Sequence, residues 1–154
     1  MINDLFFLRK VTQDDIHDVF NLSNQDFVRK YSIKKNFIMW EDHQKWFHNI
    51  LSNSLVSFYV ITDKSNRFIG QVRFSIQKKH AIVSISIIKD VMGKGYSLLF
   101  LREAITLFKK EHEQIKTIVA MICTENIASM KLFEKSGFIQ SSLKDGFYTY
   151  IYSL

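Results

Sequence analysis

The chain has 154 residues, of which 47% are hydrophobic and 23% charged, and this composition indicates one soluble globular domain over residues 1–154. A single cysteine, Cys123, excludes an internal disulfide, and five scattered histidines show no metal-ligand spacing, so we expect no bound metal. The net charge of +6 is spread along the chain without a basic helical stripe, which argues against nucleic acid and favours a small anionic ligand.

The sequence shows no signal for the membrane. No apolar run approaches the roughly 20 residues of a membrane span, and residues 1–10 lack the basic start and cleavage site of a signal peptide. We therefore expect a cytoplasmic protein without membrane contact, either a monomer or a homodimer.

The first half of the chain predicts one strand, two helices and three strands, in the order 6–11, 12–24, 39–51, 55–62, 68–77 and 81–88. Thr12 is the expected N-cap of the first helix. In the last of these strands, Ser84 and Ser86 alternate with apolar residues, which predicts one polar strand face.

The second half predicts a helix after residue 95, a strand at 117–124, a helix at 126–137 that Gly137 ends, and strands at 138–143 and 147–154. A strand, a helix and a further strand around Gly93 require a parallel strand pair, whereas the middle of the chain reads as antiparallel hairpins. The predicted class is α/β, with a mixed, mainly antiparallel sheet and helices on both faces.

The loop at 91–97, VMGKGYS, places two glycines between a strand and a helix. Backbone N–H groups at a helix N-terminus attract phosphate or pyrophosphate, and a side chain at the glycines would keep such a ligand away. The spacing is that of neither the nucleotide triphosphatase loop nor the three-glycine dinucleotide fingerprint. Taken alone, the loop fits an ordinary tight turn equally well.

A second motif at 126–138, NIASMKLFEKSGF, follows about 30 residues after the first. The pair resembles the GNAT superfamily of acyl-CoA N-acyltransferases, and the resemblance covers essentially the whole chain. It implies that acetyl-CoA is the cosubstrate and that the glycine loop binds its pyrophosphate. Ile87 and Ile88 would meet the pantetheine arm through their backbone, and Asn126 and Ser129 would flank it, although Asn126 also fits a helix N-cap. The implied cofactor residues are Ile87, Ile88, Met92, Gly93, Lys94, Gly95, Tyr96, Ser97, Asn126, Ser129 and Phe133.

Three positions depart from the family pattern. Met92 replaces an Arg or Gln and Ser97 replaces a small residue, and binding through backbone amides tolerates both. Phe133 stands where the family often has a tyrosine as general acid, and we expect its ring to face the cofactor's sulfur. A thiol with a pKa of ~8.5 can leave as a thiolate without a proton donor, so Phe133 weakens the case for acid catalysis but not for acyl transfer. Phe133→Tyr would supply such a donor.

A narrower resemblance lies in the segments VRKYSIKKNFIMWEDHQKWF (28–47), IGQVRFS (69–75) and VSISII (83–88). They resemble the bacterial GNAT enzymes that acetylate nucleotide-linked amino sugars for surface glycans, including pseudaminic-acid-type pathways. This resemblance implies direct transfer to a nucleotide-linked amino sugar, with Arg29, Tyr31, Trp40, His43 and Arg73 as candidate acceptor contacts. A residue like Trp40 is more often part of a helix core, and one like His43 more often lies on the surface. Arg73, inside a predicted strand, either lies on a solvated face or reaches the substrate.

No general base is visible, because neither strand 68–77 nor strand 81–88 contains a carboxylate. The candidates are His43, His80 and a water ordered by Ser84 or Ser86. Cys123 lies in an apolar strand and is read as a buried core residue. Two alternatives remain open: acetylation of a protein N-terminus or another small amine, and a non-catalytic CoA-binding module.

Overall fold

One sheet with the strand order β1-β2-β3-β4-β5-β7-β6 carries the whole arrangement. The computed structural model describes residues 2–154, and over this range every strand pair is antiparallel except β4–β5. The strands are β1 Phe6–Lys10, β2 Val56–Asp63, β3 Phe68–Gln77, β4 His80–Ile87, β5 Thr117–Cys123, β6 Ile139–Lys144 and β7 Phe147–Ser153. The predicted mixed, mainly antiparallel sheet is confirmed.

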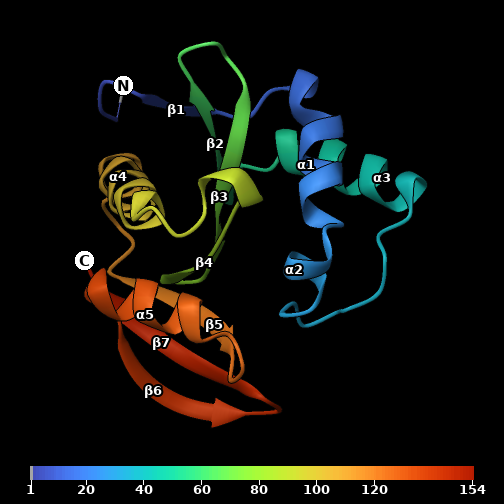
Figure 1. Cartoon of the computed structure of the whole chain (residues 1–154). Helices are drawn as coiled ribbons and strands as arrows, with labels where there is room; N and C mark the ends of the chain where they lie inside the picture. Colours follow the sequence, from blue (N-terminus) through green and yellow to red (C-terminus); the bar gives the residue numbers. More distant parts are fainter. Residues whose placement is uncertain (1) are drawn as a thin grey trace.

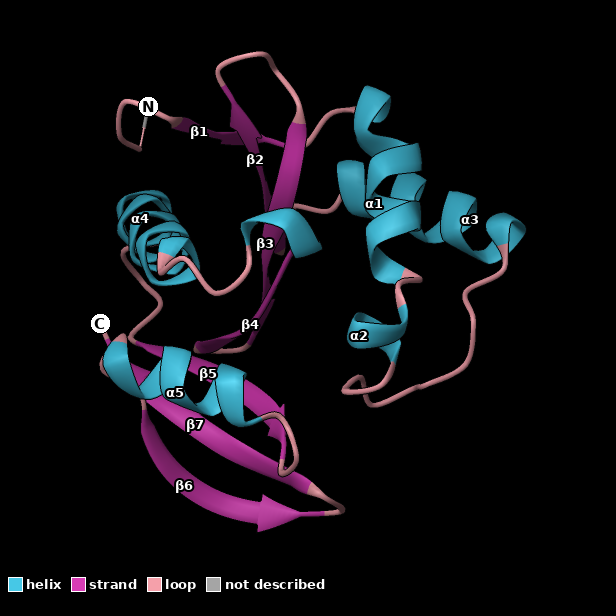
Figure 2. Cartoon of the chain, in the orientation of Figure 1, coloured by secondary structure: helices cyan, strands magenta, loops and turns pink. Residues whose placement is uncertain are grey.

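Helices cover both faces of this sheet, as predicted (Figure 1 and Figure 2). The helices are α1 Ile16–Ser23, α2 Asp26–Arg29, α3 Trp40–Leu51, α4 Tyr96–Glu111 and α5 Ile127–Lys135, with short 3-10 helices η1 Gln13–Asp15 and η2 Lys89–Val91. α4 and α5 pack on one face, and α1 and α3 cover β2 and β3 on the other. None of the helices within residues 2–154 is long and apolar enough to cross a membrane.

The main core lies between the sheet and the α4 and α5 layer. α4 buries one apolar stripe, and its Phe108 ring stacks on Phe74 of β3 with centroids 4.3 Å apart. Each such buried side chain contributes about 1.5–3 kcal/mol. A second, smaller cluster fills the space under α1 and α3, where Val19 and Phe47 contact Phe58 of β2. The two clusters place β2 and β3 between the two helical layers.

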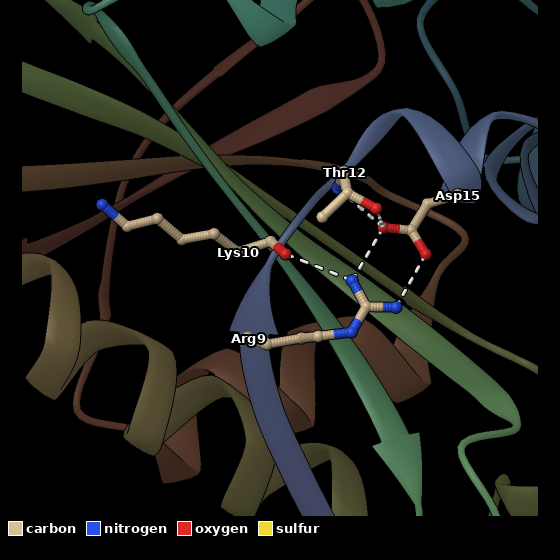
Figure 3. Close-up of polar contacts among 4 residues, drawn as sticks. All are labelled: Arg9, Lys10, Thr12 and Asp15. Carbon is tan, nitrogen blue, oxygen red and sulfur yellow. Dashed lines mark hydrogen bonds and ion pairs between the residues drawn. The ribbon is translucent and has the colours of Figure 1, made fainter.

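The predicted helix at 12–24 forms in two parts, η1 and α1, and its predicted N-cap is confirmed at Thr12 (Figure 3). The Thr12 N–H donates to Asp15 Oδ2 at 2.8 Å, while the Arg9 guanidinium donates to both carboxylate oxygens of Asp15 at 2.8 Å each. Burial alone would raise the pKa of Asp15, but the Arg9 and Thr12 hydrogen bonds lower it below its usual value. This contact ties β1 to the start of α1.

The sequence did not predict α2, a single turn that follows α1 after Asn24 and Gln25. Its four residues are too few to show a helical period. The loop between α2 and α3 is pinned by Asn24, whose side chain accepts from the Ile38 N–H at 2.7 Å and donates to the Ile38 carbonyl at 3.1 Å.

Candidate functional site

An opening separates β4 from β5 beyond their first residues. The two strands pair only where His80–Ile82 meets Thr117–Val119. On their outer edges β4 stays bonded to β3, and β5 to β7, along their full lengths. The strands therefore run apart toward their carboxyl ends (Figure 1). Each presents a backbone edge to the opening that no strand within residues 2–154 fills.

The hydrogen-bond alternation of an antiparallel pair decides which β4 groups face this opening. The Ile88 N–H donates to the Ile69 carbonyl of β3 at 2.8 Å. Alternate residues therefore direct their N–H and C=O groups away from β3, and these are Ile87, Ile85 and Val83. The expected backbone contact of Ile87 with a ligand in the opening fits this geometry. The expectation for Ile88 is corrected, because its amide is already bonded to β3.

The glycine loop lies at the mouth of the opening, between η2 and α4. Gly93 and Gly95 have φ angles of 73° and 80°, a region that side-chain-bearing residues rarely adopt. A Cβ built on either glycine meets no heavy atom within 4 Å, so the space above the loop is open.

The amides of this loop are free for an anion. Gly95 is the N-cap of α4, and no side chain caps this end of the helix. Within residues 2–154, no protein group accepts from the N–H groups of Gly95, Tyr96 or Ser97. Unpaired amides at the positive end of a 16-residue helix are suited to an anionic ligand.

The side chains of the loop differ in exposure. Met92 is 41% exposed and Lys94 is exposed, so neither is held by the core. The Tyr96 ring packs edge-on against Phe6 of β1 at 4.8 Å, which anchors the first turn of α4. A ligand on this loop would therefore meet backbone amides first, with Lys94 as an additional cation.

Asn126 and Ser129 lie at the carboxyl end of β5, on the opposite rim of the same mouth. Asn126 is the N-cap of α5, and its Oδ1 accepts from the Ser129 N–H at 3.2 Å. The helix ends as predicted, since Gly137 has a φ of 100° and its N–H donates to the Glu134 carbonyl. The capping role of Asn126 is thus shown, and its amide nitrogen remains for a ligand.

Phe133 is not exposed beside the opening, contrary to expectation. The residue is 3% exposed, and its ring packs edge-on against Phe138 with centroids 4.9 Å apart. An apolar ring has no polar group that needs a hydrogen-bond partner, so it can be buried in the main core. The structure gives Phe133 a packing role.

The polar strand face predicted at Ser84 and Ser86 extends onto β3. Ser84 lies opposite Arg73, and Ser86 lies opposite Gln71, whose Nε2 donates to Ser86 Oγ at 3.1 Å. Gln71 was not singled out from the sequence. The alternation of polar residues in FIGQVRFSIQ, which places Gln71 and Arg73 on the same side, is the signal that could have found it.

Arg73 is the cation of this polar face. Its guanidinium lies over the Trp46 ring at 4.9 Å and the Phe58 ring at 5.8 Å. No carboxylate or other hydrogen-bond acceptor pairs with it among the described residues. Burial lowers the pKa of Arg73 to about 10, so it stays charged at neutral pH. A half-buried, unpaired guanidinium has donors available for an anion.

His43 is buried, which corrects the expectation of a surface position. It is 2% exposed, and its Nε2 lies 2.8 Å from the Ile16 carbonyl. Burial lowers the pKa of His43 below its usual value, although the Ile16 hydrogen bond acts in the opposite direction. As a neutral ring packed between α1 and α3, it is not exposed to a substrate.

The other candidate acceptor contacts, Arg29, Trp40 and Tyr31, and the candidate base His80 differ in what they touch. Arg29 was expected to contact the acceptor, but its guanidinium donates to the Ser23 and Lys34 carbonyls and to Ser32 Oγ, which holds the loop after α2. Trp40 stacks on His17 at 4.7 Å, as a helix-packing residue would. Tyr31 carries Lys30 over its ring at 5.2 Å. His80 lies at the closed end of the opening, opposite Thr117.

A cavity of about 350 Å³ adjoins the polar face between α1 and η2. Its lining residues are Asp18, Asn21, Leu22, Gln25, Phe27, Arg67, Phe68, Ile88, Lys89 and Asp90. Arg67 and Asp90 pair across its rim.

Among residues 2–154, no group of three histidine, cysteine or carboxylate side chains could hold a metal ion.

Comparison with known proteins agrees with this geometry. The sequence matches the family described as "Acetyltransferase (GNAT) domain" over residues 6–139. It is 30% identical over 112 residues to YwnH of Bacillus subtilis (strain 168), provisionally named a phosphinothricin acetyltransferase. That alignment covers 69% of this chain and 66% of the relative's length.

Solved structures share the fold. The spermidine N-acetyltransferase of Vibrio cholerae, in complex with CoA and spermine, has a TM-score of 0.86 at 18% identity, over 98% of this chain and 96% of that one. The aminoglycoside acetyltransferase AAC(6')-Ib, in complex with coenzyme A, has a TM-score of 0.79 at 15% identity, over 96% and 94%.

The sheet opens between two parallel strands, and an uncapped glycine loop follows the first of them. The chain belongs to the GNAT acetyltransferase domain family, whose acetyltransferases use acetyl-CoA. The family-level prediction made from the two motifs is thereby confirmed.

Proposed function

We propose that this protein transfers the acetyl group of acetyl-CoA to the primary amine of a nucleotide-linked amino sugar. The observation that carries the proposal is the opening between β4 and β5, with free backbone edges inside and free amides of the glycine loop at its mouth. The pantetheine arm would lie along Ile85 and Ile87 and supply the thioester. No role in binding the ligands is proposed for the backbone N–H of Ile88, for Arg29 or for His43.

Transfer occurs directly in a ternary complex. The neutral amine attacks the thioester carbonyl carbon, the new C–N bond forms, and the C–S bond breaks. Coenzyme A leaves as a thiolate and later takes a proton from solvent. Cys123 is buried in β5, which supports a reaction without an acyl-cysteine intermediate.

Arg73 supports an anionic acceptor over a polycation. An unpaired guanidinium attracts phosphate and repels ammonium groups. It also lowers the pKa of an ammonium group held nearby, which favours the reactive neutral amine without a dedicated base. A polyamine would instead need carboxylates. β3 and β4 have none, and of the two that line the neighbouring cavity, Asp90 pairs with Arg67, which leaves only Asp18.

The cavity between α1 and η2 supports a nucleotide as part of this acceptor. Its volume of about 350 Å³ lies in the range of small-molecule sites. Asn21 and Gln25 offer hydrogen bonds to a base, and Lys89 offers a cation to phosphate. Because Ile88 lines this cavity and Ser86 follows on the same strand face, one elongated acceptor could occupy both places.

The test is thiol release from acetyl-CoA with a panel of acceptors. The panel contains a nucleotide-linked amino sugar, the same amino sugar without its nucleotide, spermidine, an aminoglycoside and a peptide with a free N-terminus. Turnover is expected with the nucleotide-linked sugar, and Arg73→Met is expected to reduce it far more than turnover of the free sugar. Preference for spermidine or the peptide would refute the proposed acceptor. Binding of CoA without turnover of any amine would indicate a non-catalytic CoA-binding protein.

A further inference from the structure

Gln71 occupies a buried position where its amide is only partly satisfied. The residue is 8% exposed, at the centre of β3. Its Nε2 donates to Ser86 Oγ at 3.1 Å and lies 3.4 Å from Ser23 Oγ. Its Oε1 is buried and has no hydrogen-bond partner within the described residues.

An unpaired buried oxygen is costly for a residue whose only task is packing. Leaving such an acceptor without a partner destabilises a protein, whereas an apolar side chain of similar shape at the same place does not. Methionine has nearly the length of glutamine and would fill this space without an unpaired atom. The glutamine is therefore explained by what its amide nitrogen does.

That nitrogen holds the hydroxyl of Ser86. Ser86 is half-buried and lies on the part of β4 that has no β5 partner, directly beside the opening. Its Oγ accepts one hydrogen bond from Gln71 and keeps a second lone pair and its own O–H. Ser84, two residues away on the same face, has no such partner among the described residues and is exposed.

We propose that Gln71 is a positioning residue that acts through Ser86. By fixing Ser86 Oγ, it aims the remaining lone pair at an N–H of the acceptor amine, so that the amine's own lone pair points at the thioester carbon. This inference rests on the proposed function. The step adds no reactant: the C–N bond forms, the C–S bond breaks, and the amine's proton passes to solvent.

The test compares Gln71→Met with Gln77→Met, the same substitution at an exposed position of the same strand. Gln71→Met is expected to keep or raise the melting temperature, keep the KM for acetyl-CoA, and lower kcat for the best acceptor by about tenfold or more. Gln77→Met is expected to leave both kinetic constants unchanged.

A double-mutant cycle shows whether the effect passes through Ser86. In a Ser86→Ala background, Gln71→Met is expected to cause no further loss of kcat. Independent, multiplying losses would overturn the proposal, as would an unchanged kcat in Gln71→Met. A clear fall in the melting temperature of Gln71→Met would also overturn it, because the amide would then be structural. If no amine in the panel is acetylated, the proposed function fails, whereas this stability comparison still decides whether the Gln71 amide has a structural role.

Discussion

Gly95→Ala tests whether the loop before α4 binds the coenzyme A pyrophosphate through its backbone. Gly95 has a φ of 80°, and a Cβ there meets no protein atom within 4 Å. The substitution therefore costs only the strain of a left-handed residue, about 1–2 kcal/mol. A bound pyrophosphate would meet the new methyl group at the place where it approaches the amides. Each lost hydrogen bond to a charged group costs about 1.5–3 kcal/mol, which is roughly ten- to a hundredfold in Kd.

Gly146 provides the matched control. It also has a φ of 80° and open space around its Cβ, but it lies in the turn between β6 and β7. Both alanine variants are expected to lose similar stability in thermal unfolding, and calorimetry is expected to show weaker CoA binding only for Gly95→Ala. Equal CoA affinity in the two variants would refute the assignment of the loop. Valine is a poorer choice at residue 95, because a β-branched side chain strains this backbone further.

Three further predictions concern the fold around the site. The ion pair with Arg9 lowers the pKa of Asp15. The stability that it contributes is therefore present above the pKa of Asp15 in the unfolded chain and is lost as the pH falls through the pKa in the folded protein. In urea unfolding, Asp15→Asn should lower the free energy of unfolding by about 1–3 kcal/mol at pH 7 and by less toward pH 3, and an equal loss at both pH values would contradict this. Gly70→Ala places a Cβ 2.6 Å from the Ser86 carbonyl oxygen and should cost about 1–3 kcal/mol in chemical unfolding. Unchanged stability would contradict this, because β3 and β4 would then accommodate the methyl group without strain. Phe133 was expected to face the cofactor's sulfur, but it is buried, so a hydroxyl group there would lack a partner. Phe133→Tyr should therefore lower the melting temperature and not raise kcat. A raised kcat would indicate that a tyrosine at this position can act as the general acid.

The fold could be predicted because its signals are local. Apolar, β-branched runs marked the strands, and β4 also showed alternating polar residues. Helical spacing marked α1, α3 and α4, and the glycine at residue 137 ended α5 where expected. The crossover through α4 required the parallel pair β4–β5. The sequence did not predict α2, because four residues are too few to show a helical period.

The site could be predicted only in part, because several of its features depend on tertiary packing. The length over which β4 stays paired with β5 has no sequence signal, and this length creates the opening. The burial of His43 and of Phe133 also has no sequence signal. His43 is buried because α1 packs over its face of α3, and Phe133 is part of the main core. Gln71 differs, since its alternation with Arg73 was readable.

A crystal structure of the protein with acetyl-CoA would show whether the opening between β4 and β5 binds the cosubstrate. We expect the pantetheine arm between β4 and β5, hydrogen-bonded to the backbone of Ile85 and Ile87, with the pyrophosphate on the amides of Gly95, Tyr96 and Ser97. The thioester carbonyl should lie within reach of the Ser86 side of the sheet. Acetyl-CoA bound elsewhere, or an opening that stays empty at saturating acetyl-CoA, would contradict this expectation.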